Sequence, residues 1–143
     1  MKVSIKRIDF TLPLPKYHTS GSVAFDLYAR VTITAKPFEP IVVPANIIVK
    51  VPSNYVLILA SRSSTPKKKS LMIANSIGII DQDYHGETDE VGVQVLNFSK
   101  KNVLIKKGER IAQAMLVKIA KVSEFVEANK MNSKSRGGFG STG

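Results

Sequence analysis

Cysteine is absent from this chain of 143 residues, and its absence excludes several classes of chemistry. Without thiols the protein can form no disulfide bond, no zinc–thiolate centre and no cysteine nucleophile. Aromatic residues are also few, 7% of the chain, and they are scattered along it. Such a distribution provides no platform on which the bases of single-stranded nucleic acid would stack.

Long apolar runs are missing as well. No stretch approaches the roughly 18 consecutive apolar residues of a membrane-spanning helix. The N-terminal stretch MKVSIKRIDF alternates between apolar and charged side chains, unlike the apolar centre of a signal peptide. We therefore expect no membrane partner and a cytoplasmic location.

Acidic residues are scarce, because 11 Asp and Glu stand against 21 Lys and Arg, which gives a formal net charge of +10. This excess of positive charge favours an anionic partner. Since aromatic residues are few, a small polyanion is a better candidate than nucleic acid, and we expect no nucleic-acid partner.

Five of the eleven acidic residues nevertheless lie close together: Asp81, Asp83, Glu87, Asp89 and Glu90. Asp81 alone directly follows an apolar run, where partial burial would tune its carboxylate to accept a proton. The other four lie on or beyond the following turn, so we expect them to be solvated or to pair with Lys and Arg. Gly78 and Gly86 lack a Cβ and would let the backbone come close to a ligand.

Short β-strands are expected over most of the chain, because apolar residues alternate or form brief β-branched runs. The expected strands span residues 3–8, 23–29, 31–35, 47–51, 55–60, 77–80, 91–98, 103–105 and 111–119. Prolines 37, 40 and 44 mark short connections and edges. About ten short strands predict an all-β jelly roll, sandwich or barrel. A single helical turn is expected after residues 63–66, and the lysines at 67–69 are expected in a solvated loop.

The last segment differs in composition from the rest. Residues 129–143 contain four glycines and many small polar residues, so they cannot build a core of their own. We expect one β domain over residues 1–128 and a mobile C-terminal tail over residues 129–143. The backbone N–H groups of this tail, with Arg136, Ser141 and Thr142, would suit an anion, and Phe139 would act as a lid.

Five motifs occur in one order along the chain: AFDLYA, SRSS, GIIDQDYHGE, RIAQAML and GGFGSTG. Together they resemble the five motifs of the homotrimeric dUTPases (deoxyuridine triphosphate nucleotidohydrolases), from about Gly21 to Gly143. The resemblance implies a distorted jelly-roll β-barrel or sandwich. It also implies a homotrimer with active sites shared between subunits, in which the tail closes over the active site of a neighbouring subunit.

The resemblance further implies that dUTP is hydrolysed to dUMP and pyrophosphate with Mg²⁺, by attack of water at the α-phosphate. This reaction would lower dUTP and supply dUMP for thymidylate synthesis. Asp26 of AFDLYA matches the acidic residue that binds the magnesium through water. Arg62, Ser63 and Ser64 of SRSS match the segment that holds phosphates, and Gln113 of RIAQ matches a phosphate-contacting glutamine.

The third motif matches the family motif whose residues recognise the base and the sugar of the substrate. Asn75 and the backbone from Gly78 through Ile80 to Asp81 match a hairpin that recognises uracil. Asp81 matches the aspartate that activates the attacking water. Tyr84 matches the tyrosine that packs on deoxyribose and leaves no room for a 2′-hydroxyl.

The tail motif matches a segment that covers the substrate. Phe139 matches the aromatic residue that lies over the uracil ring, and Gly140 follows it in the motif. Ser141 and Thr142 match contacts to the terminal phosphate.

The tail also departs from the family pattern, Arg-Gly-x-Gly-Gly-Phe-Gly-Ser-Thr-Gly. Lys134 stands where arginine is expected, Ser135 stands where glycine is expected, and Arg136 occupies the variable position. Either Lys134 or Arg136 would therefore bind the terminal phosphate. Lysine lacks the bidentate fork of arginine, so a contact through Lys134 would be weaker.

Two alternative functions stay open. Ser64 stands where the dUTPases usually have glycine, and such a serine also occurs in the related dCTP deaminases, some of which are bifunctional. In those enzymes a glutamate follows the aspartate of the third motif by about ten residues, which falls on Val91 here, while Glu90 would face the other side of a strand. Tyr84 and Gln113 fit the hydrolase better. The second alternative is a dUTPase-like protein whose main role is to bind a regulatory partner.

Overall fold

The computed structural model describes residues 1–131, 133–138 and 140, and within them nearly all regular structure is β. The prediction of an all-β protein is confirmed. The strands are β1 Ser4–Arg7, β2 Phe25–Tyr28, β3 Ile33–Ala35, β4 Pro40–Pro44, β5 Ile47–Lys50, β6 Tyr55–Ala60, β7 Leu71–Ile73, β8 Gly78–Ile80, β9 Gly92–Asn97, β10 Val103–Ile105 and β11 Arg110–Lys118. One short helix, α1 Thr65–Lys69, lies between β6 and β7.

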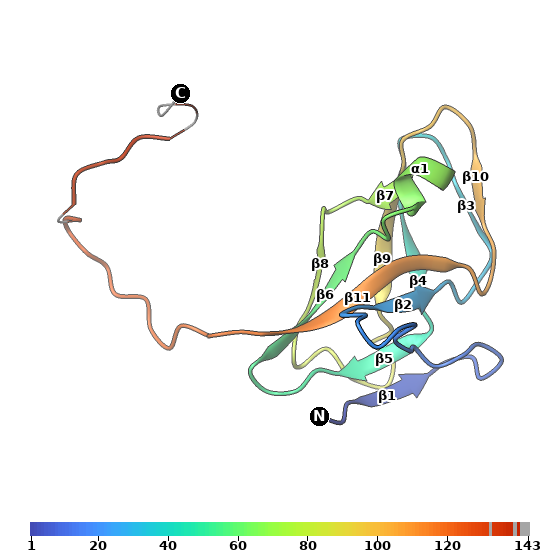
Figure 1. Ribbon diagram of the computed structural model, residues 1–143, viewed down its shortest axis with the longest axis horizontal. Coiled ribbons are helices and arrows are strands. Elements are labelled where there is room, and N and C mark those ends of the chain that lie inside the picture. Colours follow the sequence, from blue (N-terminus) through green and yellow to red (C-terminus); the bar gives the residue numbers. More distant parts are fainter. Residues whose placement is uncertain (132, 139, 141–143) are drawn as a thin grey trace.

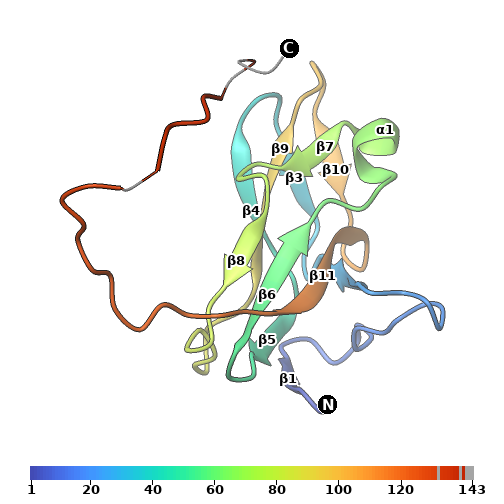
Figure 2. The same ribbon diagram turned by 60° about the vertical axis from the view of Figure 1, so that its left-hand side comes forward.

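The strands form two larger sheets and two paired ribbons (Figures 1 and 2). The four-stranded sheet has the order β2-β11-β6-β8, and the three-stranded sheet has the order β4-β9-β7. The ribbons are β1-β5 and β3-β10. Every ladder between these strands is antiparallel. Apolar side chains from all four groups meet in one core, which makes the domain a jelly-roll-like body.

The alternation expected from the sequence determines which side chains fill this core. Val91, Val93 and Val95 are buried, whereas Gln94 between them is exposed. Successive residues of a strand point to opposite faces, so one face of β9 packs inward and the other meets solvent. The shared face predicted for these valines is confirmed.

Two strands were not predicted, β4 and β7. The prolines at 40 and 44 begin and end β4, an edge strand, so their expected place at an edge is confirmed although the strand itself was not predicted. Proline cannot donate a hydrogen bond, and β4 tolerates it because this strand lies at the edge of its sheet. The strand β7 has only three residues, too few to show a period.

The helical turn predicted after residues 63–66 is α1, with Pro66 in its first turn. The lysines at 67–69 form its last turn, so their placement in a loop was wrong. Ser64 occupies the N-cap position but makes no capping hydrogen bond through its side chain. The helix ends at Ser70, whose φ of 53° is left-handed and whose N–H donates to Pro66 O at 2.9 Å.

Beyond β11 the chain leaves the body of the molecule (Figure 1). From Ala120 onward every described residue is exposed and lies outside helices and strands. In the described part of the chain, no helix is long and apolar enough to span a membrane.

Candidate functional site

A buried carboxylate in β2 gathers three cationic or ionisable side chains. Asp26 is only 8% exposed, and it lies between the apolar residues Phe25 and Leu27 of its strand. Its Oδ1 accepts a hydrogen bond from Arg62 Nε at 2.7 Å, and its Oδ2 accepts one from Arg110 Nη1 at 3.0 Å. His18 Nε2 lies 3.1 Å from the same Oδ2. A buried charge requires such partners, and we call these four residues the Asp26 cluster.

The register of the four-stranded sheet explains why these residues meet. Gln113 of β11 lies opposite Asp26 of β2 on one side and opposite Ala60 of β6 on the other. Arg62 is the second residue beyond the end of β6, and its side chain reaches across β11 to Asp26. Gln113 also donates through Nε2 to Ser61 O at 3.0 Å, which holds this end of β6 in place. Asp26, Arg62 and Gln113, three of the residues singled out in the sequence, are therefore brought together.

The surroundings of the Asp26 cluster are strongly basic. A cleft of about 190 Å³ beside it is lined by Arg62, Ser64, Thr65, Lys68, Lys69, Leu71, Glu109, Arg110 and Ile111. Four of these side chains are cationic and one is acidic, and Glu109 forms an ion pair with Lys69. Ser63 is exposed next to Arg62. Guanidinium groups and hydroxyls in this arrangement are suited to phosphate oxygens.

The segment from Asn75 to Ile80 borders a second, smaller cleft. A volume of about 130 Å³ is lined by Leu59, Ile73, Asn75, Gly78, Ile79, Ile80, Gly92, Val93 and Gln94. A cavity of about 150 Å³ is known to hold benzene. The cleft thus has the size of a single six-membered ring.

The two strands joined by the expected hairpin at this cleft, β7 and β8, do not pair with each other. β7 pairs with β9 in one sheet, whereas β8 pairs with β6 in the other. The connection from Ala74 to Ile77 therefore joins two sheets, and the cleft opens where they separate. Unpaired backbone groups at such a place can meet a ligand.

The two glycines of this region have packing reasons for lacking a Cβ. A Cβ on Gly78 would lie 2.9 Å from Leu59 Cδ1, in the core. A Cβ on Gly86 would lie 2.9 Å from Asp89 Oδ2, which already accepts a hydrogen bond from the Gly86 N–H. Internal packing therefore gives both glycines a reason to lack a Cβ, and their expected role in the close approach of a ligand stays a prediction.

Asp81 follows β8 and is exposed, in contrast to Asp26, so the partial burial expected for its carboxylate is not found in the single chain. In residues 1–131, no hydrogen bond or ion pair reaches its carboxylate. It borders the largest cleft among those around the candidate residues, about 320 Å³, lined by Tyr55, Val56, Ile80, Asp81, Gln82, Asp83, Ile119 and Lys121. Tyr84 is 40% exposed, and its hydroxyl donates to Glu90 O at 3.1 Å.

Two of the other acidic residues of this region pair with Arg or Lys and Asp83 is exposed, as expected, while Asp89 accepts from the Gly86 N–H. Glu90 accepts two hydrogen bonds from Arg30, at 2.8 and 2.9 Å, and this contact raises the pKa of the Arg30 guanidinium. Glu87 pairs with Lys6, which lowers the pKa of that carboxyl. Val91, the position of the glutamate in the deaminases, is fully buried in the core. The arrangement therefore offers no carboxylate for deamination at that position.

The two groups of candidate residues lie far apart in one chain. Ile80 pairs with Leu57, whereas Gln113, beside Asp26, pairs with Ala60 at the other end of β6. At about 3.3 Å per residue and 4.8 Å per strand, Asp26 and Asp81 are roughly 15 Å or more apart. A single chain thus does not bring the basic cluster and Asp81 to one reacting atom.

Some candidate residues of the tail can be placed and others cannot. Lys134, Arg136 and Gly140 are exposed, in the segment that has left the body of the molecule. Phe139, Ser141 and Thr142 lie outside the described residues.

Two members of the Asp26 cluster were missed in the sequence. Arg110 belongs to the RIAQ motif, in which only Gln113 was singled out, and its position at the start of an expected strand was the available signal. His18 lies in the irregular segment before β2, and nothing in its sequence neighbourhood indicates Asp26 as a partner. No group of three or more acidic, histidine or cysteine side chains that could hold a metal is found in the described residues.

A family model and a relative of known name that match this chain both belong to the dUTPases. The family model described as dUTPase matches residues 11–143. The deoxyuridine 5′-triphosphate nucleotidohydrolase of Hydrogenobaculum sp. is 40% identical over 146 residues, covering 100% of this chain and 99% of the relative.

Solved structures agree with the family model. A dUTPase mutant of Staphylococcus bacteriophage 80alpha, solved with dUpNHpp, is 26% identical, has a TM-score of 0.83 and covers 99% of this chain and 98% of its own. A dUTPase mutant of the S. aureus phage phi11, described with a structural Mg(II) ion, shares the fold at 21% identity and a TM-score of 0.79, over 91% and 98% of the two chains.

Proposed function

Because the chain belongs to the dUTPase family, we propose that it hydrolyses dUTP to dUMP and pyrophosphate. The match over residues 11–143 carries this proposal. Its product dUMP would serve thymidylate synthesis, and dUTP would be kept low. A cytoplasmic location stays a prediction of the sequence.

The Asp26 cluster is proposed to receive the phosphates. Arg62 and Arg110 present guanidinium N–H groups, Ser63 and Ser64 present hydroxyls, and Gln113 lies on β11, the strand that also carries Arg110. Phosphoryl transfer depends mainly on positioning and on stabilising charge, which cationic donors in a partly buried cleft provide.

Magnesium is proposed to accompany the substrate. Mg²⁺ usually keeps several waters and is held by one or two carboxylates together with substrate phosphates. The described residues fit such a mode, because Asp26 is a lone carboxylate beside a basic cleft and no multi-carboxylate cage surrounds it. When bound, the ion would neutralise phosphate charge, and Asp26 would hold it through water.

The β7–β8 cleft is proposed to receive uracil. Its volume of about 130 Å³ suits one ring, and the Asn75 side chain and the backbone of residues 78–80 border it. Backbone N–H and C=O groups complementary to uracil would leave the amino group of cytosine facing a donor. Buried polar groups without partners are costly, so cytosine would be rejected.

Asp81 is proposed to activate the attacking water. Its exposed carboxylate accepts a proton from the water, whose oxygen forms a bond to the α-phosphorus. The bond between that phosphorus and the bridging oxygen to the β-phosphate breaks, and pyrophosphate leaves with the bond electrons. Tyr84, close to Asp81 on the same loop, is proposed to pack on the deoxyribose and exclude a 2′-hydroxyl.

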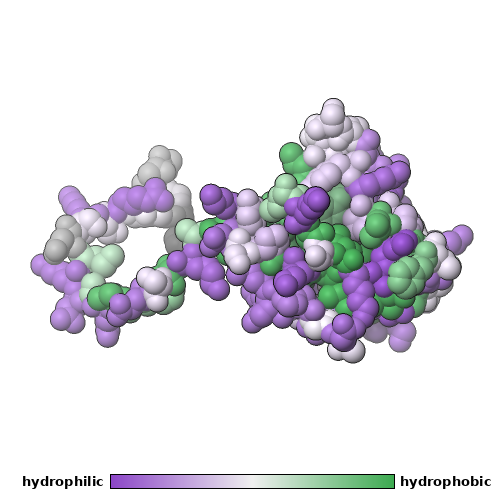
Figure 3. Space-filling model, turned by 90° about the horizontal axis from the view of Figure 1, so that it is seen from below, coloured by the Kyte–Doolittle hydropathy of each residue, from purple (hydrophilic) through white to green (hydrophobic). Residues whose placement is uncertain are grey.

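The active site is proposed to be shared among three subunits. The roughly 15 Å or more between Asp26 and Asp81 in one chain supports this proposal, because dUTP must contact both. The body also exposes apolar side chains that an assembly would cover, and Figure 3 shows such green side chains gathered among polar ones. The domain of residues 1–128 would form the trimer, and the tail would close over a neighbour's site through Lys134 or Arg136, with Phe139, Gly140, Ser141 and Thr142.

A turnover assay tests the reaction itself. Purified protein is mixed with Mg²⁺ and with dUTP or dCTP, and dUMP, pyrophosphate and ammonia are measured. We expect dUMP and pyrophosphate from dUTP and no ammonia from dCTP. Ammonia from dCTP would assign the chain to the deaminases, and absence of any turnover would leave regulatory binding as its role.

A complementation experiment tests the sharing of sites. Asp81→Asn and Arg62→Ala chains, each inactive alone, are co-expressed with different tags and the mixed oligomer is isolated. If Asp81 and Arg62 of one site come from different subunits, the mixture regains a substantial fraction of wild-type turnover. Mixed oligomers without activity would contradict sharing, and a mass other than three times the 15.6 kDa chain would contradict the trimer.

A further inference from the structure

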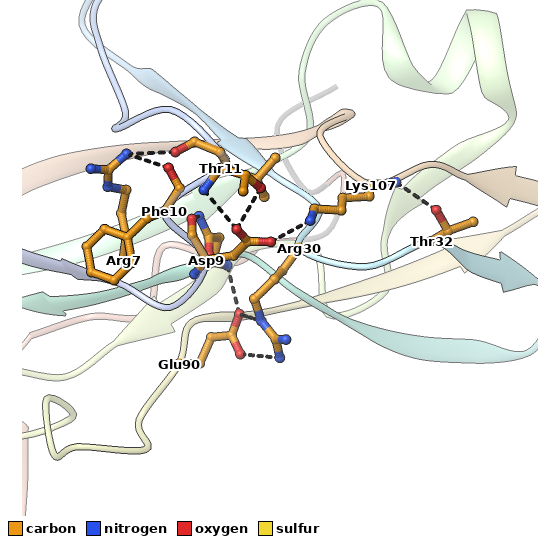
Figure 4. A network of polar contacts seen from close by, with 10 residues as sticks. Arg7, Asp9, Phe10, Thr11, Arg30, Thr32, Glu90 and Lys107 are labelled. Atoms are coloured by element: carbon orange, nitrogen blue, oxygen red, sulfur yellow. Dashed lines mark hydrogen bonds and ion pairs between the residues drawn. The ribbon is translucent and has the colours of Figure 1, made fainter.

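The loop that carries Tyr84 is fixed at its far end by a polar network. Glu90 accepts a bidentate pair of hydrogen bonds from Arg30 and a third from the Asn46 N–H, at 2.8 Å to Oε1 (Figure 4). Its side chain is only 16% exposed, and that of Arg30 is 31% exposed. Bidentate arginine–carboxylate pairs are among the strongest and most directional polar contacts in proteins.

The Asn46 side of this network is also held firmly. Asn46 is 1% exposed and has a left-handed φ of 67°. Its side chain accepts a hydrogen bond from the Asp9 N–H at 2.6 Å and donates to Asp9 O at 3.0 Å. Asp9 in turn pairs with Lys107, in the turn before β11 (Figure 4). Two separate segments of the chain, at Arg30 and Asn46, therefore contact the Glu90 carboxylate, and Asp9 holds the second of them in place.

Tyr84 is tied to this fixed point. Its hydroxyl donates to the backbone oxygen of Glu90 at 3.1 Å. The next residue, Val91, is anchored in the core, because its N–H donates to Ile47 O and its oxygen accepts from the Ala45 N–H. The hydroxyl of Tyr84 is thus held by a carbonyl that two sets of contacts fix: those of the Glu90 side chain with Arg30 and Asn46, and those of the Val91 backbone with the core.

Other contacts of the loop are weaker constraints on Tyr84. The pair between Lys6 and Glu87 is exposed, with side-chain exposures of 50% and 89%, and exposed pairs contribute little. Asp89 accepts from the Gly86 N–H within the loop and does not connect it to the body. At the start of the loop Gln82 Nε2 donates to Tyr55 O at 2.9 Å, and at its end the Glu90 carboxylate connects the residues around Tyr84's acceptor to Arg30 and Asn46.

We propose that Arg30 and Asn46, acting through Glu90, hold Tyr84 at the distance at which it discriminates deoxyribose from ribose. This inference rests on the proposed role of Tyr84 as the sugar filter. Arg30, Asn46 and Glu90 are positioning residues, since they act on the substrate only through the tyrosine. If the carbonyl of Glu90 shifts, the ring moves and a 2′-hydroxyl can be accommodated.

The ratio of kcat/KM for dUTP to kcat/KM for UTP is the appropriate measurement. A loss of folded enzyme lowers both values equally and leaves the ratio unchanged, whereas a displaced Tyr84 changes the ratio. The variants are Glu90→Gln, which keeps the size but loses the charge, and Arg30→Lys, which loses the fork. Tyr84→Phe removes only the hydroxyl that reaches Glu90, and Glu87→Gln is the matched control on the same loop.

We expect Glu90→Gln, Arg30→Lys and Tyr84→Phe each to lower the ratio by about tenfold, mainly through better use of UTP. In the double variant of Glu90→Gln with Tyr84→Phe, the ratio should fall no further than in the more strongly affected single variant. Both substitutions act on one contact, so their effects should not add. In Glu87→Gln the ratio should stay within about twofold of the wild-type value.

The possible failures are distinguishable. If wild type prefers dUTP but Glu90→Gln and Arg30→Lys keep its ratio, positioning by this network is refuted while the proposed function stands. Independent, additive effects in the double variant would also contradict action through the Tyr84 hydroxyl. If wild type does not turn over dUTP at all, the proposed function fails, and the positioning role fails with it.

Discussion

Asp26 and Asp81 are both aspartates at the sheet β2-β11-β6-β8, yet they are placed in opposite ways. Asp26 is buried on β2, the edge strand opposite β8, and two arginines donate hydrogen bonds to it within the same chain. Asp81 is exposed just beyond the edge strand β8, without a partner among the described residues of the body. The first carboxylate is satisfied by its own fold, whereas the second is available for a substrate or for another subunit.

This difference decides which property each substitution should change. A buried and paired carboxylate contributes to folding, and removing it leaves its partners unpaired. An exposed and unpaired carboxylate contributes almost nothing to folding, so its substitution affects only the chemistry. Substitution of Asp26, which is also proposed to hold magnesium through water, should therefore lower stability as well as turnover, whereas substitution of Asp81 should lower turnover alone.

The largest effect is expected for Asp81→Asn. Loss of the proton acceptor should lower kcat for dUTP by about 10³-fold, within the range for general-base catalysis, and leave the melting temperature unchanged. Steady-state kinetics and calorimetry would measure both. Asp83→Asn, also exposed on this loop, is the control and should keep turnover within about threefold. Wild-type turnover in Asp81→Asn would remove Asp81 from the mechanism.

Removal of residues 134–143 should give the next largest effect. The truncated chain would lack the proposed tail contacts to substrate, and turnover should fall by about 10²-fold, as when one charge-stabilising contact is lost. Folding should be unaffected, because the described residues of this segment are exposed and make no contact with the core. Light scattering would verify an intact oligomer. Unchanged turnover in a protein of the same mass would contradict the closing role of the tail.

Unlike Asp81→Asn, Asp26→Asn should destabilise the fold, in addition to weakening the proposed contact with magnesium. Arg62 and Arg110 would lose their shared carboxylate, and the free energy of unfolding should fall by about 2 kcal/mol. This value is below that of fully buried pairs because the two arginines are partly exposed, 22% and 45%. Urea unfolding would measure it.

The control for Asp26→Asn is Glu39→Gln, which breaks the exposed pair with Lys36 and should change stability by less than about 0.5 kcal/mol. Equal stability of Asp26→Asn and wild type would show that the Asp26 cluster is not a stabilising feature.

The smallest effect concerns Asp9, at the outer end of the network that holds the Asp81–Glu90 loop. Lys107 and Thr11 lower the pKa of the Asp9 carboxyl well below its ordinary value. A carboxyl with a lowered pKa in the folded state stabilises the protein above its ordinary pKa, near 3.8, and loses this contribution as the pH falls. The wild type should therefore be more stable than Asp9→Asn at pH 7, with a smaller difference near pH 3.

Thermal unfolding of both proteins across this pH range would measure the difference. Lys36→Met is a suitable control, because its pair with Glu39 is exposed. A difference between wild type and Asp9→Asn that grows towards low pH would contradict a lowered pKa.

Strand alternation and motif order made much of this fold predictable. The valines at 91, 93 and 95 face the core as expected, because the side-chain period of a strand does not depend on its partners. The edge strand β4 was missed, since its prolines resemble those of a connection until the edge position of the strand is known. The residues of the Asp26 cluster come from distant parts of the chain, and only the pairing of β2, β11 and β6 brings them together.

The sequence by itself determined the all-β class, the family and the candidate residues, because these depend on local pattern and on short motifs. The tertiary structure alone decided that Asp26 is buried under two arginines and that Glu90 anchors the loop of Tyr84. It also decided that Asp81 is exposed far from Asp26. Burial and distance depend on strand register and on the packing of remote segments, and no local stretch of sequence contains that information.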